Sequence, residues 1–173
     1  TTPDGSFQEG LMGLDITAYR QLTPAPDGVI VDESGYPEDY KTYELIRAST
    51  LEYGEEHFPG RAEGVAAGLY AFTDSFRFRA GSYGGYNAWR SQLAELGGVT
   101  EKNGLDKGKP FAELVWFSDC GGIIGPVVAA KLLKDFQEHL PQAEKIGSYF
   151  LENYKNWLKA FEFAADGGAV DFH

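Results

Sequence analysis

The chain has 173 residues, and its 43% hydrophobic and 14% aromatic content predicts a folded protein with a core rather than a disordered one. The net charge of −11 argues against direct nucleic-acid binding, because neutralising phosphates requires a basic surface. The sequence has no apolar run of about 18 residues, so no membrane-spanning helix is predicted, and one cysteine excludes an internal disulfide and favours a reducing, cytoplasmic location.

The negative charge is concentrated in the first third of the chain. Residues 1–60 hold 12 acids and 3 bases, a net of −9, whereas residues 61–173 hold 14 acids and 12 bases, a net of −2. A solvated acidic surface is the simplest interpretation. An alternative is that residues 28–60 dock on the basic site of a partner protein. The spaced acids and glycine of an EF-hand loop are missing, so no calcium loop is predicted.

The first half of the chain predicts strands separated by loops. Residues 1–11 are expected to be a disordered leader or a remnant of expression cloning, and residues 12–173 a single α+β domain. Alternation of apolar and polar residues predicts a strand over 14–19. Prolines, glycines and acids predict a loop over 23–40. Residues 43–48 are compatible with a strand or a helix.

Two strands, over 69–72 and 76–79, are predicted next, joined by a short hairpin-like link. In the second strand the phenylalanines share one face and the arginines the other. Ser82 suits the N-cap of a following helix. Gly97 and Gly98 are expected to end that helix.

The second half predicts helices around one buried strand. A polar loop over 102–110 leads into an apolar strand over 111–117. Pro126 suits the first turn of the next helix, and a last helix is predicted over 142–165. The tail over 169–173 is expected to fray, the alternative being that Asp171 and His173 fold back over a pocket. Together these elements predict an α+β fold, with three main helices packed on a small, mostly antiparallel sheet.

The junction over residues 118–126 combines a lone cysteine with glycines ahead of a predicted helix. A helix start lowers the pKa of a thiol, so Cys120 is a candidate nucleophile. A nucleophile also needs a base, and none of His57, His139 and His173 is singled out by the sequence. The interpretation favoured here is a small buried cysteine, with Asp119 capping the turn.

A second group of residues combines arginines with aromatic rings, which suits a planar anionic ligand. With the junction residues it forms the predicted ligand-binding set: Arg77, Arg79, Ser82, Tyr83, Tyr86, Asn87, Arg90, Ser118, Asp119, Cys120 and Gly121. The alternative is that Tyr86 and Trp89 pack in the core while the arginines pair with acids. The glycines at the junction match no nucleotide motif and offer at most a generic anion cradle. No metal site and no cofactor are predicted.

Four stretches carry a resemblance to a group of small uncharacterised proteins from bacteria and their phages. They are the opening at 12–19, the segments at 78–90 and 117–126, and the ending at 167–173. In that group an acidic residue often follows the cysteine, whereas this chain has Gly121. The resemblance implies a bacterial or phage origin and carries no function.

The function predicted from the sequence is non-catalytic binding of a small anionic or nucleotide-like ligand, such as phage-encoded sequestration of a host signalling molecule. No catalytic residue is assigned. One alternative is an acidic module that docks on a basic protein, of an anti-defence or nucleic-acid-mimic type. The other is a hydrolase or transferase that depends on Cys120. Neither nucleic acid nor a membrane is an expected partner, and the sequence leaves homo-oligomer formation open.

Overall fold

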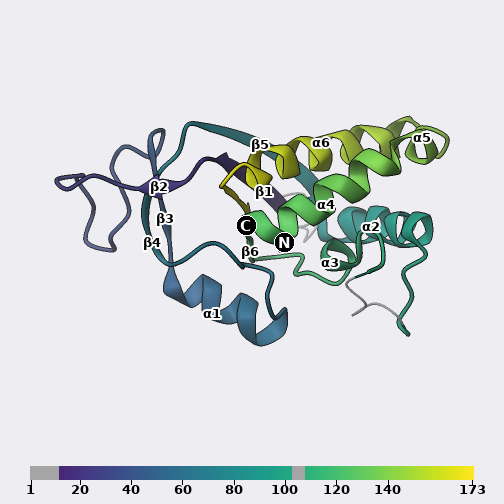
Figure 1. Cartoon of the computed structure of the whole chain (residues 1–173), viewed down its shortest axis with the longest axis horizontal. Helices are drawn as coiled ribbons and strands as arrows, with labels where there is room; N and C mark the ends of the chain where they lie inside the picture. The colour runs from purple at the N-terminus through teal and green to yellow at the C-terminus, as the bar shows by residue number, and fades with distance from the viewer. Residues whose placement is uncertain (1–11, 103–107) are drawn as a thin grey trace, which may run out of the picture.

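The structure, a computed structural model, describes residues 12–102 and 108–173. The predicted leader over 1–11 and most of the predicted loop over 102–110 therefore lie outside the described residues. The described chain forms an α+β fold in which helices flank two antiparallel sheets, as the sequence predicts (Figure 1).

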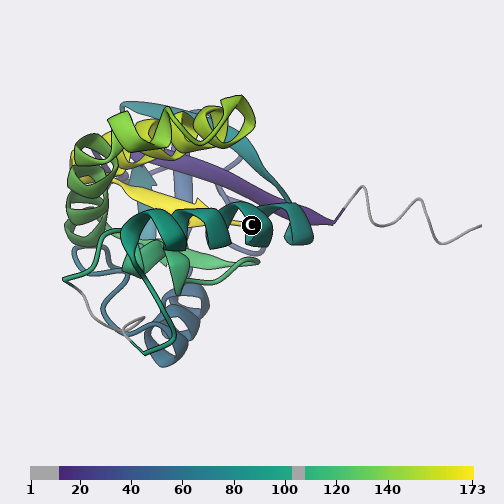
Figure 2. The ribbon, with the colours of Figure 1, turned by 90° about the vertical axis from the view of Figure 1, so that its right-hand side faces the viewer.

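The larger sheet has four strands in the order β5-β1-β7-β6. These are β5 (Asp74–Ser82), β1 (Gly13–Arg20), β7 (Ala169–Phe172) and β6 (Gly122–Ile124). Figure 2 shows β7, in yellow, inside the molecule beside β1, in purple. The two ends of the described chain therefore form the middle of one sheet.

One face of this sheet is apolar and packs against helices. Ile16 pairs in register with Phe78 on one side and Phe172 on the other, so their side chains share that face. Trp157 contacts both rings, with centroid distances of 5.1 Å to Phe78 and 5.5 Å to Phe172. Trp157 belongs to α6 (Ser148–Ala165), which lies with α4 (Pro126–Glu138) over this face (Figure 1). α2 (Tyr83–Gly97) adds Trp89, which stacks on Trp157.

The smaller sheet lies on the other side of the molecule. Its order is β2-β4-β3, formed by β2 (Thr23–Pro24), β4 (Gly68–Ala71) and β3 (Tyr43–Ile46). The chain continues from β3 into α1 (Ala48–His57). A small apolar cluster of Ile46, Ile123 and Ala169 joins this sheet to the larger one. The smaller sheet therefore approaches the face of the larger sheet that the helices leave uncovered.

Several local predictions are confirmed. The strand over 14–19 is β1, and Ser82 caps α2 by accepting a hydrogen bond from the Gly85 N–H at 3.0 Å. Gly98 ends α2 in the left-handed region, with φ 68°. Pro126 occupies the first turn of α4. In β5 the arginines are exposed and the phenylalanines half-buried, as alternation predicts.

The predicted hairpin between residues 69–72 and 76–79 is wrong. β4 and β5 belong to different sheets, and β5 pairs with β1 from Arg20↔Asp74 to Gly13↔Ser82. Residues 43–48, left ambiguous by the sequence, contain β3 and the start of α1. The sequence does not predict a helix over α1, because its apolar periodicity is weak. In the structure, Gly54 is the only buried residue of this helix.

The strand predicted over 111–117 is also wrong, because this segment contains the short helix α3 (Ala112–Val115). Phe111 adopts a left-handed φ of 65°, which breaks an extended chain, and its N–H donates to the Asp135 carboxylate at 3.1 Å. A short apolar run does not distinguish a strand from a buried helical turn.

The end of the chain differs from the prediction in two respects. α6 begins at Ser148, and the short helix α5 (Leu140–Ala143) precedes it. The tail predicted to fray is β7, whose Val170 and Phe172 are buried in the core. Hydrogen bonds in both directions between Asp15 and His173 extend the pairing to the last residue.

Candidate functional site

The face of the larger sheet opposite the helices carries polar side chains. Thr17 of β1 pairs in register with Arg77 of β5 and with Asp171 of β7, which places the three residues in a row across adjacent strands. His173 shares this face by alternation with Asp171. The Thr17 Oγ1 lies 2.9 Å from the His173 Nε2, so a hydrogen bond fixes the imidazole against β1.

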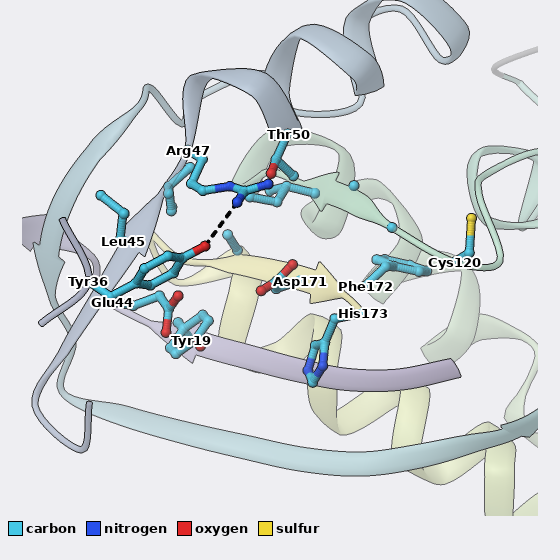
Figure 3. Close-up of a pocket in the computed structure, with 15 residues that line it drawn as sticks. Tyr19, Tyr36, Glu44, Leu45, Arg47, Thr50, Cys120, Asp171, Phe172 and His173 are labelled. Carbon is cyan, nitrogen blue, oxygen red and sulfur yellow. Dashed lines mark hydrogen bonds between the residues drawn. The ribbon is translucent and has the colours of Figure 1, made fainter. Parts of the chain in front are cut away.

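The smaller sheet encloses this polar face from the other side. The Tyr19 hydroxyl of β1 donates to the Glu44 carboxylate of β3 at 2.9 Å and so links the two sheets. Arg47, between β3 and α1, donates to the hydroxyl of Tyr36 at 3.1 Å (Figure 3). The close-up shows Glu44, Arg47 and Asp171 around a common space.

Two adjoining cavities, of about 300 and 440 Å³, fill the space between the sheets. Both are lined by Tyr19, Glu44, Asp171 and His173, and we call the joined space the inter-sheet cavity. The first part extends toward Arg47, Thr50, Cys120 and Gly121. The second extends toward Thr17, Lys41 and Arg77. Volumes of this order are typical of sites for small molecules.

The acidic groups in this cavity are strongly perturbed. The pKa of Asp171 is raised to about 7, mainly by burial and in addition by the nearby negative charge of Glu44, against the lowering effect of Arg47 and Arg77. Burial also raises the pKa of Glu44, although hydrogen bonds from the Tyr19 hydroxyl and the Leu45 backbone oppose the shift. Near neutral pH the Asp171 carboxyl is therefore protonated part of the time.

Two further titratable groups of the cavity, Tyr19 and His173, favour their neutral forms. Burial raises the pKa of the Tyr19 hydroxyl, and the charge of Glu44 raises it further. Burial lowers the pKa of His173, and the positive charge of Arg77 adds to the effect. Neutral Tyr19 and His173 can each donate and accept hydrogen bonds. The cavity thus presents neutral polar groups and carboxyl groups between two arginines.

Three residues of the predicted ligand-binding set line the cavity, namely Arg77, Cys120 and Gly121. The expectation that Cys120 is buried is wrong, because the residue is exposed. The Ser118 hydroxyl accepts the N–H groups of Cys120 and Gly121, at 3.2 and 3.1 Å, and this tight turn leaves the thiol at the surface.

The predicted capping role of Asp119 is likewise wrong, since Ser118 caps the turn. The Asp119 carboxylate instead accepts a hydrogen bond from the Asn87 side chain at 3.0 Å. Arg90 donates to the Phe117 carbonyl oxygen and to the Asn87 side-chain oxygen. These bonds fasten α2 to the junction that follows α3.

The remaining predicted residues lie outside the inter-sheet cavity. Tyr86 is fully buried beneath Arg90, whose guanidinium lies 4.9 Å from the ring centroid. Tyr86 and Trp89 therefore pack in the core, as the alternative interpretation held. Arg79 pairs with Asp15 at 3.1 Å. Ser82 caps α2, and Tyr83 is its first residue.

Sequence reasoning missed Tyr19, Glu44 and Arg47. It favoured a frayed tail over residues 169–173, but the alternative that Asp171 and His173 fold back over a pocket agrees with their place in the cavity lining. The alternation of apolar and polar residues along the strands carries a signal for Asp171 and Glu44. Asp171 stands between the apolar Val170 and Phe172, and Glu44 stands between Tyr43 and Leu45. A polar residue between two apolar ones in a strand faces away from the core.

Among the described residues, no three His, Cys, Asp or Glu side chains are grouped so as to hold a metal ion. No described helix has both the length and the apolar character needed to cross a membrane. No protein family, curated protein or solved structure matches the chain. The chain is thus defined by its α+β fold and a polar cavity between two sheets.

Proposed function

We propose that the protein binds a small anionic or nucleotide-like molecule in the inter-sheet cavity. The observation that carries the proposal is the convergence of both cavities on Tyr19, Glu44, Asp171 and His173. Tyr19, Glu44 and Asp171 come from three different strands, β1, β3 and β7, and His173 directly follows β7. Polar groups that converge in one cavity are the usual mark of a ligand site.

The arginines determine the charge of the proposed ligand. Arg47 and Arg77 lie at different ends of the inter-sheet cavity, one in each part. A guanidinium group binds phosphate or carboxylate through two parallel hydrogen bonds. Asp171, Glu44 and Thr17 provide partners for hydroxyl or amino groups of the same ligand. A phosphorylated sugar or nucleotide combines both kinds of group.

This location differs from the one expected from the sequence. The sequence placed the ligand between residues 77–90 and 118–126, but the network of Asn87, Arg90 and Asp119 already joins these segments by hydrogen bonds. The proposal keeps Arg77, Cys120 and Gly121 and adds residues of β1, β3 and β7.

Calorimetric titration with nucleoside 5′-monophosphates, nucleoside diphosphates and sugar phosphates tests this proposal. The informative variant is Arg77→Gln, with Arg79→Gln as the matched control on the same face of the same strand. We expect at least one ligand to bind. Arg77→Gln should lower its affinity about tenfold or more, in line with the loss of a charge-assisted hydrogen bond. Arg79→Gln keeps the wild-type affinity. No binding across the panel, or equal affinity in both variants, contradicts the proposal.

A second candidate function is docking of the acidic segment on a basic protein, and exposed apolar residues favour it. Within residues 28–60, Ile30 and Tyr40 are 66% and 69% exposed, beside the acids at 32, 33, 38 and 39. Such a surface predicts association that weakens as salt rises. Pull-down from a bacterial lysate at low and high salt tests it, and capture that does not depend on salt argues against it.

A function that depends on Cys120 remains a further prediction. The exposed thiol at one end of the cavity supports it, because a nucleophile must be accessible. Cys120→Ser distinguishes it from simple binding. A Cys120-dependent enzyme loses activity in this variant while it still binds its ligand, whereas the binding protein proposed above has no activity to lose. The cytoplasmic location and the phage or bacterial origin also remain proposals.

A further inference from the structure

We propose that the inter-sheet cavity is an active site that hydrolyses the glycosidic bond of an anionic glycoside, with Asp171 as general acid and Glu44 as general base. The inference rests on the proposed function, because it uses the same cavity and the same anionic ligand. It goes beyond that function, since binding alone requires no pair of carboxyl groups.

The two carboxyl groups belong to opposite walls of the cavity. Asp171 projects from β7, which lies between β1 and β6 in the larger sheet, and Glu44 projects from β3 of the smaller sheet. Both residues line both parts of the cavity. A molecule held between the sheets therefore meets one carboxyl group on each side, as glycoside hydrolysis requires.

The hydrogen bonds of the two carboxyl groups differ. Glu44 accepts the Tyr19 hydroxyl at 2.9 Å and a backbone hydrogen bond from Leu45, and both stabilise its ionised form. Within residues 12–102 and 108–173, the structure shows no hydrogen bond to the Asp171 carboxyl group. Two carboxyl groups in unlike environments divide into an acid and a base. Glu44 is the member that ionises first, and Asp171 is the member that retains its proton.

Charged and titratable groups surround Asp171 on several elements. Glu44 approaches from β3 and Arg77 from β5, while Arg47 approaches from the start of α1. Tyr19 of β1 and His173 line the same cavity. From β6 the register partner is the apolar Ile123. The pKa of Asp171, raised to about 7 mainly by burial, is consistent with an acid that works near neutral pH.

The proposed reaction balances with water as the only second reactant. Asp171 donates its proton to the leaving oxygen or nitrogen as the bond to the anomeric carbon breaks, and the bonding electron pair stays with the leaving atom. Water attacks the anomeric carbon and passes a proton to Glu44. Exchange with solvent then returns a proton to Asp171 and removes one from Glu44.

The charge of Glu44 favours this reaction over acyl or phosphoryl transfer. Glycoside hydrolysis develops positive charge on the sugar, which a carboxylate stabilises. Acyl and phosphoryl transfer develop negative charge on oxygen, which needs hydrogen-bond donors or cations at the reacting centre. Here the arginines flank the carboxyl groups, where they are suited to hold a fixed anionic group of the substrate.

Two sources of anionic glycoside share this chemistry, and the experiment separates them. One arm incubates the full chain with AMP and follows release of adenine by chromatography. The other uses 4-nitrophenyl glucoside 6-phosphate and follows release of 4-nitrophenol. We expect release in one arm, with a rate that falls above about pH 7 as Asp171 ionises and falls in acid as Glu44 is protonated.

Two isosteric variants identify the carboxyl groups. With AMP, whose adenine needs a proton to leave, Asp171→Asn and Glu44→Gln should each lower the rate at least about 100-fold, whereas the exposed Asp74→Asn of β5 should keep it. With the 4-nitrophenyl substrate, whose leaving group needs little protonation, only Glu44→Gln should lower the rate to this extent. Thermal unfolding and calorimetry on the same samples show whether each variant folds and binds. A folded Asp171→Asn that binds AMP but does not hydrolyse it supports the inference.

The outcomes separate hydrolysis from binding. Ligand binding by the wild-type chain without product release in either arm overturns hydrolysis and leaves the proposed binding function standing. Release that survives in folded Glu44→Gln, or release of adenine that survives in folded Asp171→Asn, also overturns it. Absence of binding overturns both proposals together.

Discussion

The Tyr19 hydroxyl donates a hydrogen bond to the Glu44 carboxylate at 2.9 Å, and this bond joins β1 of the larger sheet to β3 of the smaller one. Both residues line the two adjoining parts of the inter-sheet cavity. The bond therefore has two consequences. It holds the second sheet over the first, and it favours the ionised form of Glu44.

Removing that hydroxyl tests both consequences. Tyr19→Phe should lower the free energy of unfolding by about 1 kcal/mol, with Glu44 left part-buried and without its donor. It should also raise the pKa of Glu44, which moves the acid limb of any pH–rate profile upward. Urea denaturation measures the first effect, with Tyr53→Phe on the exposed side of α1 as the control. Equal stability of Tyr19→Phe and wild type would show that the bond does not hold the sheets together.

The perturbed carboxyl group of Asp171 predicts a pH dependence of stability. Its pKa in the folded protein is about 7, above its ordinary value of 3.8, so the folded state binds more protons than the unfolded state between these values. This contribution to stability is present in acid and is lost as the pH rises through about 7. Burial is the main cause that raises this pKa and Glu44 adds to it, whereas Arg47 and Arg77 lower it.

Asp171→Asn removes this dependence. At pH 8 the variant should be more stable than wild type by about 1–3 kcal/mol, because it no longer places a charge in the cavity. At pH 5 the difference should shrink, since wild-type Asp171 is then protonated. Denaturation at both pH values measures it, with Asp74→Asn as an exposed control. A variant that is less stable than wild type at pH 8 contradicts the assignment.

The turn before β7 depends on a close backbone approach. A Cβ built on Gly168 would lie 1.7 Å from the Tyr19 carbonyl oxygen, so no side chain fits there without moving β1 or β7. Gly168→Ala should destabilise the fold by several kcal/mol, roughly as overpacking does. Gly84→Ala is the matched control, because nothing lies within 4 Å of its Cβ position in α2. Equal melting temperatures for the two variants would contradict the placement of β7.

Arg90→Ala separates the two locations considered for the ligand. Arg90 donates to the Phe117 carbonyl and the Asn87 side chain, so its loss should lower stability by about 1–2 kcal/mol. Ligand affinity should remain within about twofold of wild type, since Arg90 lines neither part of the inter-sheet cavity. Loss of binding in a folded Arg90→Ala protein would move the site to the surface between α2 and α3.

Local signals in the sequence are enough to predict many of the helices and strands. The alternation in β1, the cap at Ser82 and the proline at the start of α4 each involve neighbours within a few residues. The strand assigned to 111–117 failed because the left-handed Phe111 is held by Asp135, which belongs to another helix. That interaction has no local signature.

The site was harder to predict because its parts meet only through sheet pairing. Thr17 and Asp171 are register partners from opposite ends of the chain. Glu44 reaches them from a different sheet. The sequence pointed to Arg77 and Cys120, yet the residues that surround them in space are set by the order β5-β1-β7-β6.

The location of the ligand is the central claim, and an NMR titration tests it most directly. Isotope-labelled protein titrated with AMP, NAD⁺ or 4-nitrophenyl glucoside 6-phosphate reports which backbone amides change. We expect shifts to concentrate at residues 17–19, 44–47 and 169–173, which border the inter-sheet cavity. Shifts concentrated at residues 87–94 and 115–119, or no shifts with any of the three, would contradict the account.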